Sequence, residues 1–198
     1  MKKLLKRIGI CLVLAASVWC GSLLADRQRL NDGLIRFHVV ANSDSEEDQS
    51  VKLQVRDAVL NSLQSDLNKI ADVNEARAYL QAKLPQIQAV ANSVLEATGC
   101  DCEAVVTLCK EAFDTRYYDT FTLPAGIYEA LRITIGEGEG HNWWCVLYPN
   151  MCFRGSVYEV VEDEAKENLK EVLTPDEYES IFDSGKYEIK LKILDIFR

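Results

Sequence analysis

Residues 126–152, GIYEALRITIGEGEGHNWWCVLYPNMC, are the stretch from which the fold is best approached. Residues 127–135 carry apolar side chains three and four apart, a spacing that favours a helix, while the alternation at Ile133 and Ile135 leaves a strand open. The glycines of residues 136–140 indicate a loop. Residues 143–148 are aromatic and β-branched and lie between turn residues, so they predict a strand.

The alternating glycines of this loop raise the question of a phosphate site. Phosphate-binding loops present free backbone N–H groups beside a positive charge or a helix N-terminus. Here Glu137 and Glu139 lie between the glycines and would repel an anion. The pattern therefore predicts a turn rather than a phosphate-binding loop.

Residues 1–25 have the composition of an export signal. Basic residues without any acidic ones occupy the first seven positions, and residues 8–25 carry no charge. Small residues that suit cleavage follow Cys20 and occur again at Ala25. The uncharged segment is also near the minimum length of a membrane-spanning helix, so a cleaved signal peptide and an uncleaved anchor both stay open.

The positive charge ahead of the apolar segment predicts which side of the membrane the rest of the chain occupies. Such a flank stays in the cytoplasm, so residues 26–198 are expected outside it. Within that part, residues 26–33 are polar and predict a linker, and residues 34–198 predict one extracytoplasmic domain.

The whole chain is acidic, with 22 Lys and Arg residues against 31 Asp and Glu residues and a net charge of −9. Because the leader contributes only basic residues, the exported part is more acidic still. A strongly acidic domain is a poor binder of nucleic acid or of anionic lipid headgroups.

Five cysteines lie outside the leader, so at least one is a free thiol or bonds another chain. Cys145 and Cys152 flank a Pro-Asn turn, and a returning strand would bring them together as a disulfide; two buried thiols are the alternative. Cys100, Cys102 and Cys109 lack the C-x-x-C spacing. A zinc site that used these three with His141 would need four converging ligands, so no metal site is predicted.

The amino-terminal half of the domain predicts a strand and two helices. Residues 34–40 alternate as a strand with one buried face, which places His38 on an exposed or half-exposed face. A long amphipathic helix follows over residues 45–67, with Ser43 or Ser45 as its cap. A second helix is predicted over residues 74–97.

Proline and glycine punctuate the rest of the predicted elements. Pro85 is expected to break or kink the second helix, and Gly99 is expected to end it. Further predicted elements are a hairpin of strands at 102–109 and 116–121, helices at 162–173 and 174–182, and a last strand at 187–193. Strands that follow one another as well as helices indicate a single α+β domain with one mixed sheet of about five strands, helices packed on it, and the signal or anchor helix in front.

Two long blocks of the chain resemble a known family. Residues 35–60, IRFHVVANSDSEEDQSVKLQVRDAVL, and residues 123–152, LPAGIYEALRITIGEGEGHNWWCVLYPNMC, look like stage II sporulation protein R. The leader and the closing segment 186–194, KYEIKLKIL, are similar to that family as well. The resemblance covers nearly all of the chain from residue 34 to residue 193.

This resemblance implies a secreted signalling protein of endospore-forming bacteria. Family members are made in the forespore and exported into the space between the forespore and mother-cell membranes. There they activate a membrane-embedded aspartic protease of the mother cell, which matures pro-sigma-E. The resemblance supplies no catalytic residue, metal or cofactor, so an enzyme is not expected.

We expect the protease to contact the second half of the quoted stretch. The candidate contact residues are Trp143, Trp144, Gly138, Gly140 and His141. Strand alternation puts the two indole rings on opposite faces, so one ring is expected in the core and the other exposed as an interface anchor, although both rings packed in the core stay open.

Two other classes of function stay open. One is a secreted cell-wall hydrolase that uses Cys145 as nucleophile with His141 or His38 as base. The other is a peptidoglycan-binding protein, for which exposed tryptophans are suitable.

Overall fold

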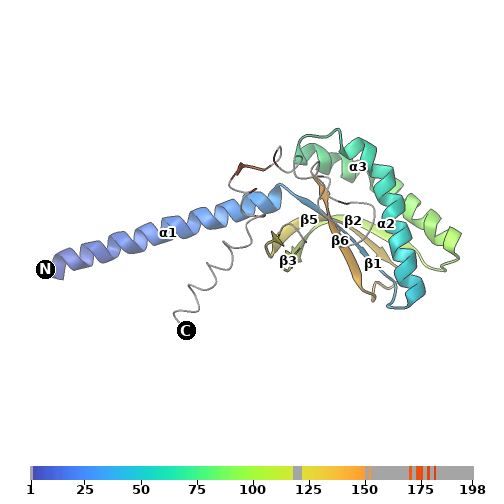
Figure 1. The fold of residues 1–198 in the computed structure, drawn as a ribbon, viewed down its shortest axis with the longest axis horizontal. Helices are drawn as coiled ribbons and strands as arrows, with labels where there is room; N and C mark the ends of the chain where they lie inside the picture. The colour runs from blue at the N-terminus through green and yellow to red at the C-terminus, as the bar shows by residue number, and fades with distance from the viewer. Residues whose placement is uncertain are drawn as a thin grey trace.

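The structure is a computed structural model that describes residues 2–117, 122–149, 152, 170, 173–175, 178 and 181. A long helix projects from a body in which two helices lie on one face of a sheet (Figure 1). The elements in chain order are α1 (Lys2–Asp32), β1 (Ile35–Val40), α2 (Glu46–Leu67), α3 (Val73–Thr98), β2 (Ala104–Phe113), β3 (Arg116–Tyr117), β4 (Thr122–Leu123), β5 (Gly126–Ile135) and β6 (Asn142–Tyr148).

The main sheet is mixed, as predicted, and has the strand order β2-β5-β1-β6. β1 runs parallel to β5 and antiparallel to β6, and β2 runs antiparallel to β5. The described residues thus form an α+β fold with four strands in the main sheet and a separate two-stranded ribbon, β3-β4. The predicted strand at 187–193 lies outside the described residues.

The favoured helix at residues 127–135 was wrong, because this segment is the strand β5. β5 lies between β2 and β1, so both of its sheet edges are paired. Side chains from both faces are buried, including Tyr128 and Ala130 on one face and Leu131 and Ile133 on the other. A strand that is buried on both sides loses strict alternation, which explains the helix-like spacing.

The exposed position predicted for His38 was also wrong. All six residues of β1 are buried, and His38 is only 4% exposed. The prediction assumed that one face of this strand meets solvent. Instead, α2 and α3 cover the face of Phe37, and a second apolar cluster covers the face of Arg36 and His38.

The two helices on the sheet begin and end where local chemistry predicts. The Ser45 hydroxyl accepts a hydrogen bond from the Asp48 N–H and caps α2. α3 ends at Gly99, whose φ of 74° places it in the left-handed region. Pro85 lies inside α3, which continues through it, so of the predicted break or kink the break does not occur, and the kink stays a prediction.

The hairpin predicted from strands 102–109 and 116–121 does not form as expected. β2 is longer than predicted and pairs along its whole length with β5. β3 pairs instead with β4. The predicted helices at 162–173 and 174–182 lie largely outside the described residues, although the Tyr178 N–H donates to the Thr174 carbonyl at 2.9 Å, as a helical turn after Thr174 requires.

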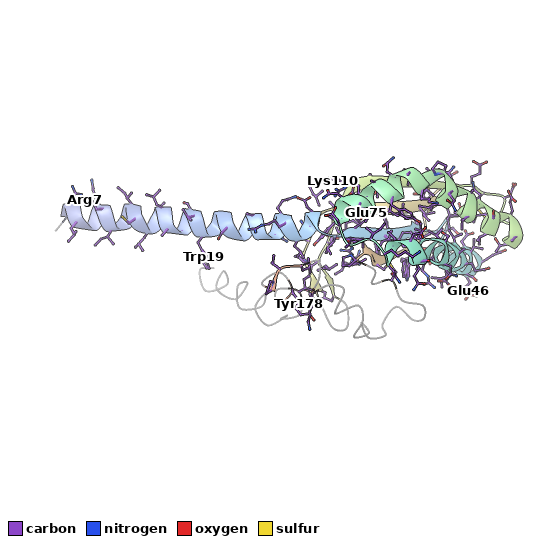
Figure 2. The ribbon with its side chains drawn as sticks, turned by 90° about the horizontal axis from the view of Figure 1, so that it is seen from above. Arg7, Trp19, Glu46, Glu75, Lys110 and Tyr178 are labelled. Carbon is purple, nitrogen blue, oxygen red and sulfur yellow. A yellow bond between two sulfur atoms is a disulfide. The ribbon has the colours of Figure 1, made fainter. Side chains whose placement is uncertain are left out.

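The predicted linker at residues 26–33 is helical through residue 32, where it continues α1 and packs against the sheet. Leu30 and Asn31 are 2% and 4% exposed, whereas Ile8 and Val18 are 49% and 74% exposed. Figure 2 shows Arg7 and Trp19 on the projecting part of α1, and the Lys110 amino group lies 3.5 Å from Asp32 at its other end. Among the helices of the described residues, none combines the length and the apolarity that crossing a bilayer requires.

Candidate contact surface

The loop at residues 136–140, here called the glycine loop, joins β5 to β6 and depends on its glycines. Gly136 and Gly138 have φ values of 56° and 67°, which side-chain-bearing residues rarely adopt. A Cβ on Gly138 would lie 2.5 Å from Thr134 Cγ2, and one on Gly140 would lie 2.2 Å from the Ser43 carbonyl oxygen. The glycines therefore permit both the turn and its close approach to the chain after β1.

The glycine loop is bonded to the segment that follows β1. The N–H groups of Glu139 and Gly140 donate to the carbonyl oxygens of Asn42 and Ala41 at 3.1 and 3.0 Å. The Glu137 N–H donates to the Asn42 side-chain oxygen at 3.1 Å. These contacts join the two sequence blocks, residues 35–60 and 123–152, that resemble the sporulation family, and they hold the loop in one conformation.

His141 lies at the end of the glycine loop and is fixed by its backbone. Its N–H donates to an Asp44 carboxylate oxygen at 2.7 Å, and its carbonyl accepts from the Lys52 amino group at 2.9 Å. The His141 ring also contacts Asp44 through Nδ1, and this bond is the main reason that the Asp44 pKa lies below its usual value. The imidazole itself stays 81% exposed, so it is presented to solvent on a rigid support.

Asp48 holds in place the segment after β1 that bonds the glycine loop. Its carboxylate accepts hydrogen bonds from the Ser43 hydroxyl and from the Asn42 side-chain N–H. These bonds, with the Ser43 bond first, lower the Asp48 pKa. Asp48 therefore holds Asn42 in the orientation in which its oxygen meets the Glu137 N–H.

The two tryptophans lie on opposite faces of β6, as alternation predicts. Trp143 is 9% exposed and makes an edge contact with Phe37 in the core under the helices. Trp144 lies half-buried on the other face, where the Arg116 guanidinium is 3.9 Å from its ring centre. Of the two rings, only Trp144 is placed to meet a partner.

Trp144 belongs to a row of side chains that crosses the face of the sheet opposite the helices. The strand pairings align Thr107 with Arg132, Arg132 with His38 and His38 with Trp144. Gly138 lies against the same face, because a Cβ there would meet Thr134 and Val40. The glycine loop and Trp144 thus border the part of this face that the second apolar cluster leaves uncovered, where Thr107 is exposed and Arg132 is half-buried. We call this part the open sheet face.

Glu111 organises the polar part of the open sheet face. Its carboxylate lies 3.0 Å from His38 Nε2 and 3.4 Å from an Arg132 nitrogen, and it accepts from the Cys109 thiol at 3.2 Å. Burial lowers the His38 pKa, against the opposing effect of Glu111. Burial, with Glu111, raises the Cys109 pKa, so this thiol is a poor nucleophile.

Four of the described cysteines form disulfides. Cys145 bonds Cys152, the pair proposed from the sequence, and Cys100 bonds Cys102, which the sequence reasoning had left unpaired. Cys109 is a free thiol. Within the described part of the chain, no group of three or more His, Cys, Asp or Glu side chains is arranged to hold a metal ion.

Sequence reasoning missed the residues that support the surface. Asn42 and Asp44 lie beside the predicted helix cap and were given no role, although Asn and Asp directly after a strand are typical of side chains that bond a neighbouring loop. Arg116 gave no local signal, because its contact with Trp144 joins residues that are distant in sequence.

The fold and this surface define an α+β protein that presents a rigid glycine loop and a stacked tryptophan beside an open sheet face. The chain belongs to the stage II sporulation protein R family, whose model matches residues 31–158. Stage II sporulation protein R of Bacillus subtilis (strain 168) is 43% identical over 122 residues, which cover 62% of this chain and 54% of that protein. The chain thus spans about half the length of this curated relative, and no solved structure matches it. Family membership supports a role in sporulation.

Proposed function

We propose that this protein is an exported signal of endospore formation that activates a membrane-embedded aspartic protease of the mother cell and so leads to maturation of pro-sigma-E. The observation that carries the proposal is the family match over residues 31–158, which includes the sheet, the glycine loop and Trp144. The basic, then uncharged, leader supports export into the space between the forespore and mother-cell membranes.

The contact with the protease is proposed at the glycine loop and Trp144. His141 is 81% exposed on a loop whose backbone is bonded at several points, so little conformational freedom is lost when a partner binds. The half-buried Trp144, covered on one side by Arg116, has the character of an interface anchor. A rigid loop next to an aromatic anchor suits recognition of another protein.

The geometry favours this proposal over a cell-wall hydrolase. The Cys145 sulfur is bonded to Cys152, so it is not available as the nucleophile of that alternative. His38, the second candidate base, is buried on the sheet face opposite Cys145 and does not reach that sulfur. A peptidoglycan site built on two exposed tryptophans also loses one ring, because Trp143 is in the core.

The test is co-expression of this chain with the protease and pro-sigma-E in a host that does not sporulate. Processing of pro-sigma-E is expected only when the chain is present. Trp144→Ala and His141→Ala are expected to reduce processing, whereas Leu53→Ala on the exposed side of α2 serves as the control and leaves it unchanged.

Each variant is also compared with the unmodified chain by circular dichroism and by thermal unfolding, so that a folding defect is not mistaken for lost contact. Processing of pro-sigma-E without the chain would refute the proposed activation. Full processing by both folded variants, Trp144→Ala and His141→Ala, would refute the proposed contact surface.

A further inference from the structure

The Cys100–Cys102 disulfide lies where the helix layer meets the sheet. α3 ends at Gly99, and the Cys100 N–H then donates to the Leu95 carbonyl at 3.0 Å. The two cysteines are half-buried, with Cα atoms 5.4 Å apart, and both pack against the main core. The residue between them is exposed, so the bond is within reach of a thiol or disulfide in solution.

A single residue separates this disulfide from the glycine loop. Glu103 follows Cys102, and its carbonyl accepts a hydrogen bond from the Gly136 N–H at 2.9 Å. The next residue, Ala104, donates to the Asn92 side chain of α3 at 2.8 Å and pairs with Ile135 at the end of β5. The loop therefore starts from a position that the disulfide-bonded turn holds.

The far side of the loop is held in the same manner. Gly140 and His141 bond the segment after β1, and Cys145, within the following strand, is bonded to Cys152. The glycine loop is thus bounded by one disulfide on each side, which is more covalent restraint than the described remainder of the body has.

We propose that the Cys100–Cys102 pair is a redox modification site that controls how rigidly the glycine loop is held. The contact surface is complete only after the two thiols are oxidised. Oxidation removes one proton from each thiol and passes two electrons to the disulfide of a protein oxidant, which becomes a dithiol. Thiols stay reduced in the cytoplasm and are oxidised outside it, so the surface matures upon export.

The effect of this bond is local. A disulfide stabilises a protein mainly by closing a loop in the unfolded chain, and the effect grows with loop length. The loop closed by Cys100 and Cys102 is among the shortest that a disulfide can close, so its loss leaves the global fold intact. What it removes is the restraint on Glu103 and, through that carbonyl, on Gly136.

Amide hydrogen exchange of the full oxidised chain, followed by mass spectrometry, tests this inference. The double variant Cys100→Ala/Cys102→Ala is compared with Cys109→Ala, which removes the free thiol on the open sheet face. Exchange at residues 136–141 is expected to rise about tenfold or more in the double variant, with α2 unchanged, and to stay the same in the control. Reduction of the unmodified chain by dithiothreitol, which also opens Cys145–Cys152, is expected to raise exchange in the loop at least as much as the double variant does.

Unchanged exchange at residues 136–141 in both the double variant and the reduced chain would overturn the proposal, as would a uniform rise over the whole body. The claim that oxidation controls contact with the protease rests on the proposed function, and the effect of the disulfide on the loop is tested separately from that function. A loosened loop with unaltered pro-sigma-E processing would refute the contact role of the loop and leave the redox site standing.

Discussion

Substitution of Gly140 by alanine is expected to detach the glycine loop from the chain after β1. The new Cβ would lie 2.2 Å from the Ser43 carbonyl oxygen and 2.9 Å from the Ala41 Cβ. The conflict is with backbone, so no side-chain rotation relieves it. The loop must move away, which breaks the hydrogen bonds that the N–H groups of Glu139, Gly140 and His141 donate.

The magnitude follows from those contacts. Three hydrogen bonds at roughly 1 kcal/mol each give a loss of about 2–3 kcal/mol in the free energy of unfolding. Gly99→Ala is the matched control, because it makes the same chemical change at a φ of 74° with no atom within 4 Å of the new Cβ. The control is expected to lose only about 1 kcal/mol from the left-handed backbone.

Urea unfolding followed by tryptophan fluorescence measures both variants under the same conditions. The difference in midpoint, converted with a common slope, gives the difference in free energy. If Gly140→Ala destabilises the protein no more than Gly99→Ala does, the close approach to Ser43 does not hold the loop, and the argument for a rigid contact surface is refuted.

Three further predictions concern the buried groups. Burial lowers the folded-state pKa of His38 below 6.5, so the contribution of His38 to stability is present above pH 6.5 and is lost as the pH falls through the folded-state pKa. The unfolding free energy of His38→Gln is therefore expected to fall less between pH 7.5 and pH 5 than that of the unmodified protein. An identical fall in both proteins would contradict this. Deletion of residues 1–26 is expected to leave the melting temperature of the body unchanged, whereas deletion of residues 1–33 removes the buried last turn of α1 and lowers it; equal melting temperatures would show that this turn is dispensable. Trp143→Ala is expected to cost about 3–5 kcal/mol in urea unfolding and Trp144→Ala clearly less, and the opposite order would reverse their assignment to core and surface.

The features that could be predicted from the sequence are those with local causes. The cap of α2 and the Gly99 end of α3 depend on one or two residues each. α3 ends where predicted, and Ser45 is the one of the two candidate caps, Ser43 and Ser45, that caps α2. The opposite faces of Trp143 and Trp144 follow from strand geometry alone. The mixed α+β sheet follows from the order of such elements.

The features that could not be predicted depend on distant neighbours. β5 resembled a helix because its cover on both faces comes from elements elsewhere in the chain. The last turn of α1 resembled a linker because nothing local shows that Asn31 packs on Gly126, where a Cβ would lie 2.3 Å from its side-chain nitrogen. The support of the glycine loop by Asn42 is likewise a contact between separate blocks of sequence.

The parallel pairing of β1 with β5 has a consequence for how the chain assembles. β1 is the first strand to be synthesised, yet Ile35 finds its partners only at Glu129 and Tyr148, after both helices have been made. Until then this apolar segment has two unpaired edges that invite association with other chains. A nascent or truncated polypeptide that ends before residue 126 therefore carries a strand without its parallel partner, and we expect such distant pairing to make completion of the sheet slow.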